Sequence, residues 1–269
     1  MSPDPDESEH VNALRDGYKA HHRLLQLVGI TLFFGLTAVV LSRLSLTTLY
    51  LTAGEAGCLV LAAVLAGYLF ADFSSGVIHW VFDNYGKETL PVIGPAFIRP
   101  FRHHHAAPRD LCEHGFVQLN GNNCLVSLPM FWLAAGSDIG PDRAGSTLFF
   151  GLFCVSTAWF VFGTNQFHAW AHATDLPRWV QRLQATRLVL PPAHHNRHHT
   201  APHNQAYCIT SGIMDAVLGR IAFFRILEVL IEQLTGCSPL HRRTQEPSPA
   251  SRVDAATERS HPANSALAG

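Results

Sequence analysis

The histidines of this chain are the residues whose number and placement most clearly predict chemistry. The sequence contains 17 of them, against 5 Trp and 3 Met. Away from the two termini they gather in a few stretches: His79, His103 to His105, His114, His168 with His172, and His194, His195, His198, His199 and His203. Because the neutral imidazole is the commonest metal-binding side chain, this clustering predicts a metal centre.

The spacing within these stretches places several imidazoles on one side of a helix. Positions i, i+3 and i+4 share a helix face, and the motifs HWVFD (79–83), HAWAH (168–172) and HNRHH (195–199) all have that spacing. Pro202 disfavours a helix just before it, so His203 is expected on a different local element. A single HxxxH is common by chance and one HxxHH is moderately specific, whereas an HH pair, an HxxxH and an HxxHH together on one membrane face form a strong signal.

A structural role is the alternative for any single histidine, because a lone imidazole in an apolar setting more often makes an ordinary hydrogen bond than it binds metal. We assign the isolated His10, His21, His22, His241 and His261 to that class. The same assignment fails for the clusters. An unpartnered buried polar group costs roughly 1–3 kcal/mol, so about ten such rings would offset the ~5–15 kcal/mol that stabilises a typical fold.

The number of histidines also favours iron over other metals. A zinc site uses three or four protein ligands, and the zinc protease motif HExxH is absent from the sequence. Soluble di-iron bundles use carboxylates and Glu-x-x-His pairs, whereas Asp83 is the only carboxylate at useful spacing from a cluster. Copper and nickel accept imidazole but rarely need so many rings, and two iron ions that share about eight to ten imidazoles fit the count best.

Long uncharged runs indicate the elements that must hold these histidines. Charged residues make up only 14% of the chain and hydrophobic residues 48%, and the apolar segments lie at 24–42, 56–71, 124–136 and 144–167. A helix of about 20 residues crosses a hydrocarbon core of about 30 Å. We therefore predict an all-α integral membrane protein with about four transmembrane helices and a histidine-rich helical cap. The third segment is short for a full crossing.

The positive charges orient these helices. If residues 1–23, 72–123 and 168–269 share one side, only Arg43 and Arg143 fall on the other side. By the positive-inside rule, the first side is cytoplasmic. This side carries every clustered histidine and both termini, so we predict a cytoplasmic metal site.

The domain limits follow from the same composition changes. We predict a polar N-terminal segment (1–23), a membrane domain (24–237) and a disordered tail (238–269) rich in Ser, Pro and Ala. Apolar residues recur at helical spacing over 207–234. That helix is expected either to pack on the cytoplasmic cap or to lie in the lipid headgroups.

Charge and cysteine content exclude several classes of function. The net charge of −1 provides no basic field for nucleic acid. The six cysteines are scattered without a CxxC pair, so neither a disulfide framework nor a cysteine-bound zinc is indicated.

At the histidine stretches the chain resembles a known family. The segments ADFSSGVIHWVFDNYG (71–86), RPFRHHHAAP (99–108), EHGFVQLNGNNC (113–124), TNQFHAWAH (164–172) and LPPAHHNRHHTAPHNQAYCITSG (190–212) are similar to those of the plasmanylethanolamine desaturase family. Plant relatives of that family desaturate an acyl chain of phosphatidylglycerol. The resemblance covers about residues 65–235, and its ordered motifs make it specific.

The resemblance implies the set of ligands. The residues that match the family's histidines, and that we expect to bind metal, are His79, His104, His105, His114, His168, His172, His195, His198, His199 and His203. His103 stands where relatives usually have another residue, so we leave it out. EHGF and NGNN replace the family's more usual RHDF and NGDN, which puts in doubt the roles of those acids. Asp83 and Asn123 are expected to assist catalysis by orienting the rings, although Asn122 and Asn123 could equally cap a turn.

The resemblance also implies a reaction. A di-iron centre would use O₂ and two electrons to introduce the vinyl-ether double bond into a 1-O-alkyl (plasmanyl) phospholipid, which gives a plasmalogen. The sequence contains no GxGxxG, cysteine-cluster or haem motif, so we expect an external electron donor of the cytochrome b5 or ferredoxin type. Two alternatives remain: a fatty-acyl desaturase or hydroxylase on the same scaffold, and a non-enzymatic membrane protein that binds metal.

Overall fold

The computed structural model describes residues 20–244, and every regular element in that range is helical. The long helices are α2 (Ala20–Thr47), α3 (Ala53–Asn84), α6 (Phe116–Ala135) and α7 (Ala144–His172). Shorter ones are η1 (Thr48–Tyr50), η2 (Gly94–Ile98), α4 (Arg99–Ala106), α5 (Asp110–Glu113), η3 (Pro141–Arg143), α8 (Arg178–Ala185), α9 (Pro192–His198), α10 (Ile213–Arg220), α11 (Phe223–Thr235) and α12 (Leu240–Arg243). The predicted all-α class is confirmed.

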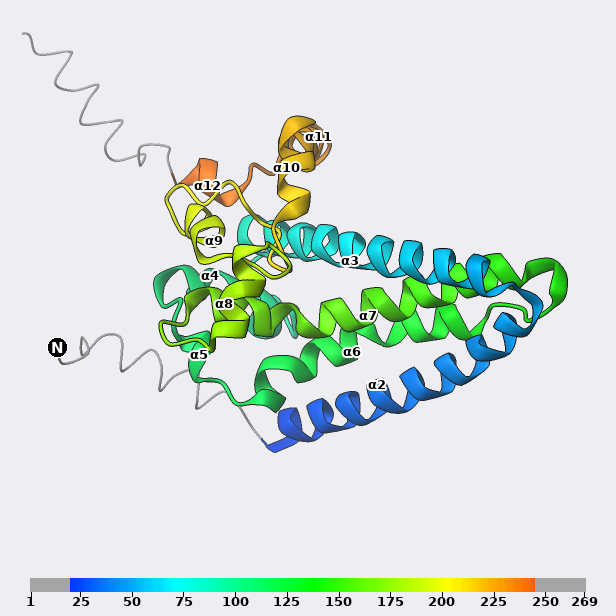
Figure 1. Cartoon of the computed structure of the whole chain (residues 1–269). Helices are drawn as coiled ribbons and strands as arrows, with labels where there is room; N and C mark the ends of the chain where they lie inside the picture. The colour runs from blue at the N-terminus through cyan, green and yellow to red at the C-terminus, as the bar shows by residue number, and fades with distance from the viewer. Residues whose placement is uncertain (1–19, 245–269) are drawn as a thin grey trace, which may run out of the picture.

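The long helices run side by side, and the short ones other than η1 and η3 gather at one end of the bundle (Figure 1). Three stretches of the described chain are long and apolar enough to cross a membrane, namely Ala20–Tyr50, Ala53–Asn84 and Pro141–His172. At 1.5 Å per residue, the 32 residues of α3 extend about 48 Å, well beyond the ~30 Å of a hydrocarbon core. The last turns of α3 and α7, which carry histidines, can therefore project out of the lipid.

The outer surface of the bundle is apolar, as expected for helices surrounded by lipid. Leu49, Leu61 and Trp132 are 78%, 71% and 82% exposed, and the inner faces of the long helices are apolar as well. Phe33, Phe131 and their neighbours form a core between α2, α6 and α7. A helix that is apolar all round suits a membrane, not water. The chain is an integral membrane protein.

Small residues let these helices approach closely. A side chain at Gly67 of α3 would collide with Ser156 of α7, whose Cβ lies 2.6 Å from the position of the added atom. Gly121 of α6 meets Gln26 of α2 in the same way. Close contact through small residues is how membrane helices associate, because lipid provides no hydrophobic drive between them.

The helix α6 begins earlier than the apolar segment at 124–136 predicts. It starts at Phe116, so Asn120, Asn122 and Asn123 lie inside a helix and not in a loop. Its 20 residues extend about 30 Å alongside α7. It is not among the three stretches that are long and apolar enough to span, so the fourth crossing stays a prediction.

The C-terminal part of the described chain also differs from a single helix over 207–234. Residues 207–212 are not helical, and the helix that follows is broken after Arg220 into α10 and α11, where Ala222 has a left-handed φ of 51°. The helix α12 lies within the segment that we predicted to be a tail. The Arg242 side chain binds Glu228 and Glu232 of α11, both at 2.8 Å. Residues 1–19 and 245–269, which hold His10 and His261, lie outside the described range.

Candidate metal centre

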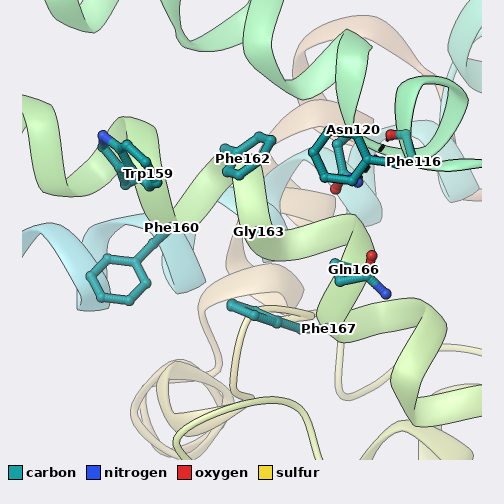
Figure 2. A pocket seen from close by; sticks show the side chains of 8 residues that line it. All are labelled: Phe116, Asn120, Trp159, Phe160, Phe162, Gly163, Gln166 and Phe167. Carbon is teal, nitrogen blue, oxygen red and sulfur yellow. Dashed lines mark hydrogen bonds between the residues drawn. The ribbon is translucent and has the colours of Figure 1, made fainter. Parts of the chain in front are cut away.

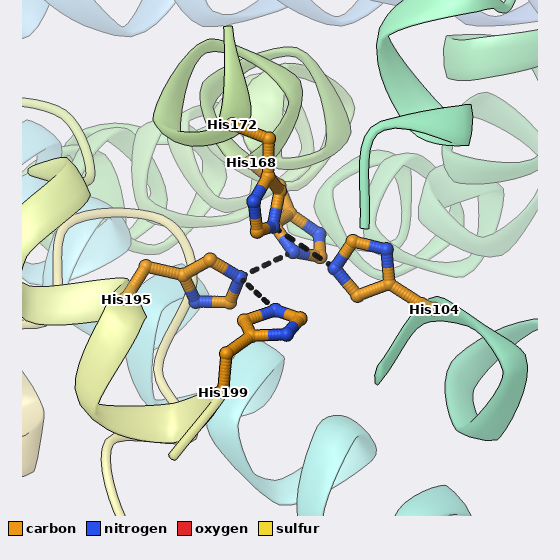
Figure 3. A group of neighbouring side chains, drawn as sticks. All are labelled: His104, His168, His172, His195 and His199. Carbon is orange, nitrogen blue, oxygen red and sulfur yellow. Dashed lines mark hydrogen bonds between the residues drawn. The ribbon is translucent and has the colours of Figure 1, made fainter. Parts of the chain in front are cut away.

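Nine side chains form two adjacent groups at the end of the bundle where the short helices lie. The first, the five-histidine group, contains His104, His168, His172, His195 and His199 (Figure 3). The second, the aspartate group, contains His79, Asp83, His105 and His198. Within each group the potential ligand atoms all lie within 4.8 Å of one another. Rings from the two groups adjoin, with 5.3 Å between the centroids of His105 and His199.

The ring nitrogens of the five-histidine group converge. The Nε2 atom of His195 lies 2.7 Å from Nε2 of His168 and 3.0 Å from Nε2 of His199. The Nε2 atoms of His104 and His172 are also 3.0 Å apart. Two nitrogens that bind one metal at about 2.1 Å and at right angles are about 3.0 Å apart. The spacing of these imidazoles therefore suits a shared ion.

The aspartate group is built around one carboxylate. The Oδ2 atom of Asp83 lies 3.2 Å from Nε2 of His198, 3.3 Å from Nε2 of His105 and 3.5 Å from Nε2 of His79. Asp83 is only 6% exposed. Neither of its side-chain oxygens makes a contact with the geometry of a hydrogen bond, and Nε2 of His79 makes none either. These atoms surround a common point, and the only hydrogen bond among them joins Nε2 of His198 to Nε2 of His105 at 3.0 Å.

Unpartnered buried atoms test whether a metal fits here. Nδ1 of His195 and Nδ1 of His199 lack a hydrogen-bond partner, as do Nε2 of His79 and both oxygens of Asp83. Buried polar groups are nearly always partnered in folded proteins. A metal ion at the common point of the aspartate group would complete Nε2 of His79 and the Asp83 carboxylate. The unpartnered Nδ1 atoms of His195 and His199 belong to rings whose Nε2 atoms converge, so they are not the ligand atoms.

Two backbone carbonyls orient rings of the aspartate group. Nδ1 of His79 lies 3.1 Å from the carbonyl oxygen of Tyr207, and Nδ1 of His198 lies 2.9 Å from that of Gln205. A carbonyl oxygen can only accept, so each Nδ1 must carry the proton and donate. The lone pair of each neutral ring is then on Nε2, the atom that faces Asp83. Such fixing of the tautomer is typical of metal-binding histidines.

The segment that supplies these carbonyls is itself held by α3. The carboxylate of Asp72 accepts hydrogen bonds from the N–H groups of Ser211 at 2.7 Å, Gly212 at 3.0 Å and Met214 at 2.9 Å. Gly76 allows the close approach, because a Cβ there would lie 2.5 Å from Sγ of Cys208. The sequence argument missed Asp72, although a carboxylate at the end of an apolar run is the kind of signal that marks a functional or structural contact.

Burial keeps the rings of the cap neutral. Desolvation, followed by the neighbouring histidines, holds the pKa of His104 and that of His195 well below the ordinary value. The same causes lower the pKa of His199 to about 2. A neutral imidazole has a free lone pair at neutral pH, so these rings can bind a cation without first losing a proton.

Two predicted ligands lie outside both groups. His203 has a left-handed φ of 60°, and its Nδ1 lies 2.9 Å from the carbonyl oxygen of His198, to which it donates. Its ring centroid is 4.4 Å from that of His105, so it packs behind the aspartate group. His114 follows α5 and belongs to neither group, although burial lowers its pKa. Their metal-binding roles stay predictions, and His103, which we left out, also lies in neither group.

Asn123 joins two helices at some remove from the ligands. Its Nδ2 donates to the carbonyl oxygen of Val161 at 2.8 Å, and its Oδ1 accepts from Asn165 at 3.4 Å. Both partners belong to α7. A catalytic role for Asn123 therefore stays a prediction, and its contacts fit a residue that fixes α6 against α7.

An apolar groove of about 390 Å³ lies on α6 and α7 (Figure 2). Its lining includes Phe116, Phe160, Gly163 and Phe167. Gly163 and His168 are five residues apart, which is about 140° around a helix. Gly163 therefore lies on a different face of α7 from His168, and no residue of the lining belongs to either group of potential ligands.

Known proteins resemble this chain over most of its length. A family model described as "Lipid desaturase domain" matches residues 68–242. The plasmanylethanolamine desaturase of Myxococcus xanthus is 40% identical over 86% of this chain and 79% of its own length. Plasmanylethanolamine desaturase 1 of Mus musculus is 38% identical over 88% of this chain and 92% of its own. The chloroplastic fatty acid desaturase 4 of Arabidopsis thaliana is 36% identical over 68% and 54%. No solved structure matches the chain.

Proposed function

Since this chain belongs to the lipid desaturase domain family, and is thus a membrane desaturase, we propose that its two groups of side chains bind two iron ions. The observation that carries this proposal is the pair of adjoining donor sets, five imidazoles in one and three imidazoles with Asp83 in the other. Imidazole-rich sites suit iron, copper, nickel and zinc. A dehydrogenation that uses O₂ needs a metal that changes its oxidation state, and zinc does not.

We further propose that the substrate is a phospholipid with a 1-O-alkyl chain and that the product is the vinyl ether of a plasmalogen. The names of the bacterial and mouse relatives support this substrate class. The lipid would lose two hydrogen atoms beside the ether oxygen. One O₂ would accept two electrons from the lipid and two from an external donor of the cytochrome b5 or ferredoxin type, and with two protons from solvent it would leave as two waters.

The iron pair would supply O₂ activation, and the chain's own residues would prepare the site. Asp83 provides the only carboxylate among the nine potential ligands of the two groups. The carbonyl groups of Gln205 and Tyr207 keep the His198 and His79 lone pairs on Nε2. Burial of His195 and His198, both 0% exposed, keeps bulk water from the oxidising centre. By the positive-inside argument, this end of the bundle faces the cytoplasm, where soluble or membrane-anchored electron donors are available.

Acyl-chain desaturation is the second candidate, and the plant fatty acid desaturase relative favours it. This candidate includes hydroxylation of an acyl chain on the same scaffold. The third alternative, a non-enzymatic metal-binding protein, is wrong, because the chain belongs to a family of desaturases.

A lipid assay in a host that lacks plasmalogens tests these proposals. Wild type is expected to convert plasmanyl lipid to vinyl-ether lipid, whereas His168→Ala and His199→Ala should lose both activity and bound iron. His103→Ala is the matched control, because His103 shares α4 with His104 but lies in neither group. A new acyl double bond without vinyl ether would select the second candidate. Full activity in both histidine variants would refute the site.

A further inference from the structure

The helix α11 buries a glutamate and exposes a stripe of large apolar residues, which is unusual for a surface helix in water. Glu228, which is 5% exposed, faces inward, where it accepts hydrogen bonds from Trp80 Nε1 at 3.4 Å and from Arg242 at 2.8 Å. The opposite face carries Ile226, Leu230 and Leu234, which are 52%, 46% and 83% exposed. These three residues are four apart and thus form one stripe. A carboxylate of this helix is thus buried while an apolar stripe is exposed.

The direction of α11 excludes a further membrane crossing. In Figure 1, α3 lies across the view, whereas α11 is seen nearly along its own axis, so the two helices are roughly perpendicular. A helix perpendicular to the spans lies parallel to the membrane plane. Its 13 residues are also too few to cross the ~30 Å hydrocarbon core.

The level of α11 along α3 coincides with the edge of the hydrocarbon. The ring of Phe223 lies 5.6 Å from that of Phe73, and the ring of Phe224 lies 5.5 Å from that of Trp80. About 18 Å of α3 exceeds the thickness of the core. Shared equally between both ends, that excess places the boundary about six residues before Asn84, between the two contact points.

We propose that the exposed face of α10 and α11 is inserted into the headgroup and acyl boundary of the leaflet next to the metal end. The occupant of this face is therefore lipid. Val217 and Ile221, 44% and 55% exposed, continue the apolar stripe onto α10. Exposed Arg220 and Arg225 flank the stripe and can reach lipid phosphates, as long basic side chains do at an interface.

This insertion sets the depth of the metal end. Glu228 connects α11 to Trp80 of α3, and His241 of α12 lies 2.8 Å from Asn84 Oδ1 through its Nδ1, to which it can donate. Trp80 directly follows the ligand His79, and Asn84 directly follows the ligand Asp83. The anchored helix thus holds the end of α3 at a constant height relative to the lipid. The inference needs only membrane insertion, so it goes beyond the proposed reaction and is independent of it.

Site-specific quenching in proteoliposomes tests this placement. The full chain, with the exposed Cys58, Cys112 and Cys237 replaced by serine, receives a fluorescent label at Leu230→Cys or Leu234→Cys. The matched control is Gln181→Cys, on the exposed surface of α8. We expect phosphatidylcholine with a spin label on its acyl chain to quench both α11 labels, and aqueous iodide to quench only the control.

Two results would overturn the placement. Quenching of the α11 labels by iodide alone would mean that the face is in water. Quenching by neither agent would mean that protein, such as a second copy of the chain, covers it. Neither result depends on turnover or bound metal, so a failure of this inference is distinguishable from a failure of the proposed reaction.

Discussion

Removing the carboxylate of Asp72 is expected to disorganise the aspartate group from a distance. Asp72 is fully buried and accepts three backbone hydrogen bonds, from Ser211, Gly212 and Met214. A hydrogen bond to a charged group contributes about 1.5–3 kcal/mol, so three contribute about 4.5–9 kcal/mol. That range approaches the ~5–15 kcal/mol of a whole fold. We therefore expect Asp72→Ala to yield little folded protein.

The milder substitution Asp72→Asn separates stability from metal binding. An asparagine can keep one oxygen for the N–H groups of Ser211 and Gly212, but it presents an amide N–H₂ to the N–H of Met214. The loss of one bond costs about 1.5–3 kcal/mol, which a folded protein can survive. The same segment carries the carbonyls that orient His79 and His198. Loss of such an orienting contact lowers metal affinity by about 10–100-fold.

The assay combines thermal unfolding in detergent with iron content per chain. Asp72→Asn is expected to unfold at lower temperature and to lose iron from the aspartate group first, so that its content falls from about two ions toward one. The exposed Asp142→Ala serves as the control and should match wild type in both measurements. An unchanged Tm and unchanged iron content in Asp72→Asn would refute the argument that this segment positions the rings.

Three further changes have definite expected outcomes. Asp83→Asn keeps the size of the side chain but removes the charge of the aspartate group, so iron content and turnover should both fall; equal turnover would argue against Asp83 as a ligand. Burial lowers the pKa of His199 from 6.5 to about 2, so its contribution to metal-free stability is full above pH 6.5 and is lost as the pH falls below that value. The Tm of chelator-treated protein should therefore fall between pH 8 and pH 5. A constant Tm would contradict this sign. Gly76→Ala places a Cβ against Sγ of Cys208 and should lower Tm, while adding Cys208→Ala should restore part of the loss; no recovery would mean that the backbone of Cys208, not its sulfur, is the obstacle.

Spacing alone predicted the contacts that lie within one helix. His79 and Asp83 share a face of α3, as do His168 and His172 on α7. Pro202 also correctly indicated that His203 leaves the local helix, since α9 ends at His198. Helical periodicity determines such relations without any knowledge of the tertiary structure.

The division of the ligands into two groups could not be predicted from spacing. His105 joins His198, 93 residues later, while its neighbour His104 joins His172. Consecutive residues on a helix point about 100° apart, so His104 and His105 must face different partners. Which partner each one meets depends on how α4 packs between α7 and α9. The family resemblance also includes His114 and His203, which lie in neither group, so their metal-binding roles stay predictions.

The start of α6 was missed for a different reason. The polar run from Asn120 to Asn123 resembles a turn when it is read alone, because asparagine favours turns. In the structure these amides make contacts between helices: Asn122 accepts from Gln26 of α2 and Asn123 donates to Val161 of α7. Tertiary hydrogen bonds replaced the local ones that a turn would have provided, because an amide needs partners but not particular ones.

The unpartnered atoms of the metal end make the stability of this region depend on bound metal. The unpartnered Nε2 of His79 and the two oxygens of Asp83 each cost free energy while the ions are absent, and metal binding removes these costs together. Binding energy of this kind acts as folding energy. The long helices contact one another through residues such as Gly67, which belongs to neither group, and they do not share in that gain. Chelation should therefore loosen α4, α9 and the 205–212 segment while the membrane bundle remains folded. Amide exchange measured with and without iron should differ at the metal end alone; a uniform change along the chain would show that bundle and site unfold as one unit.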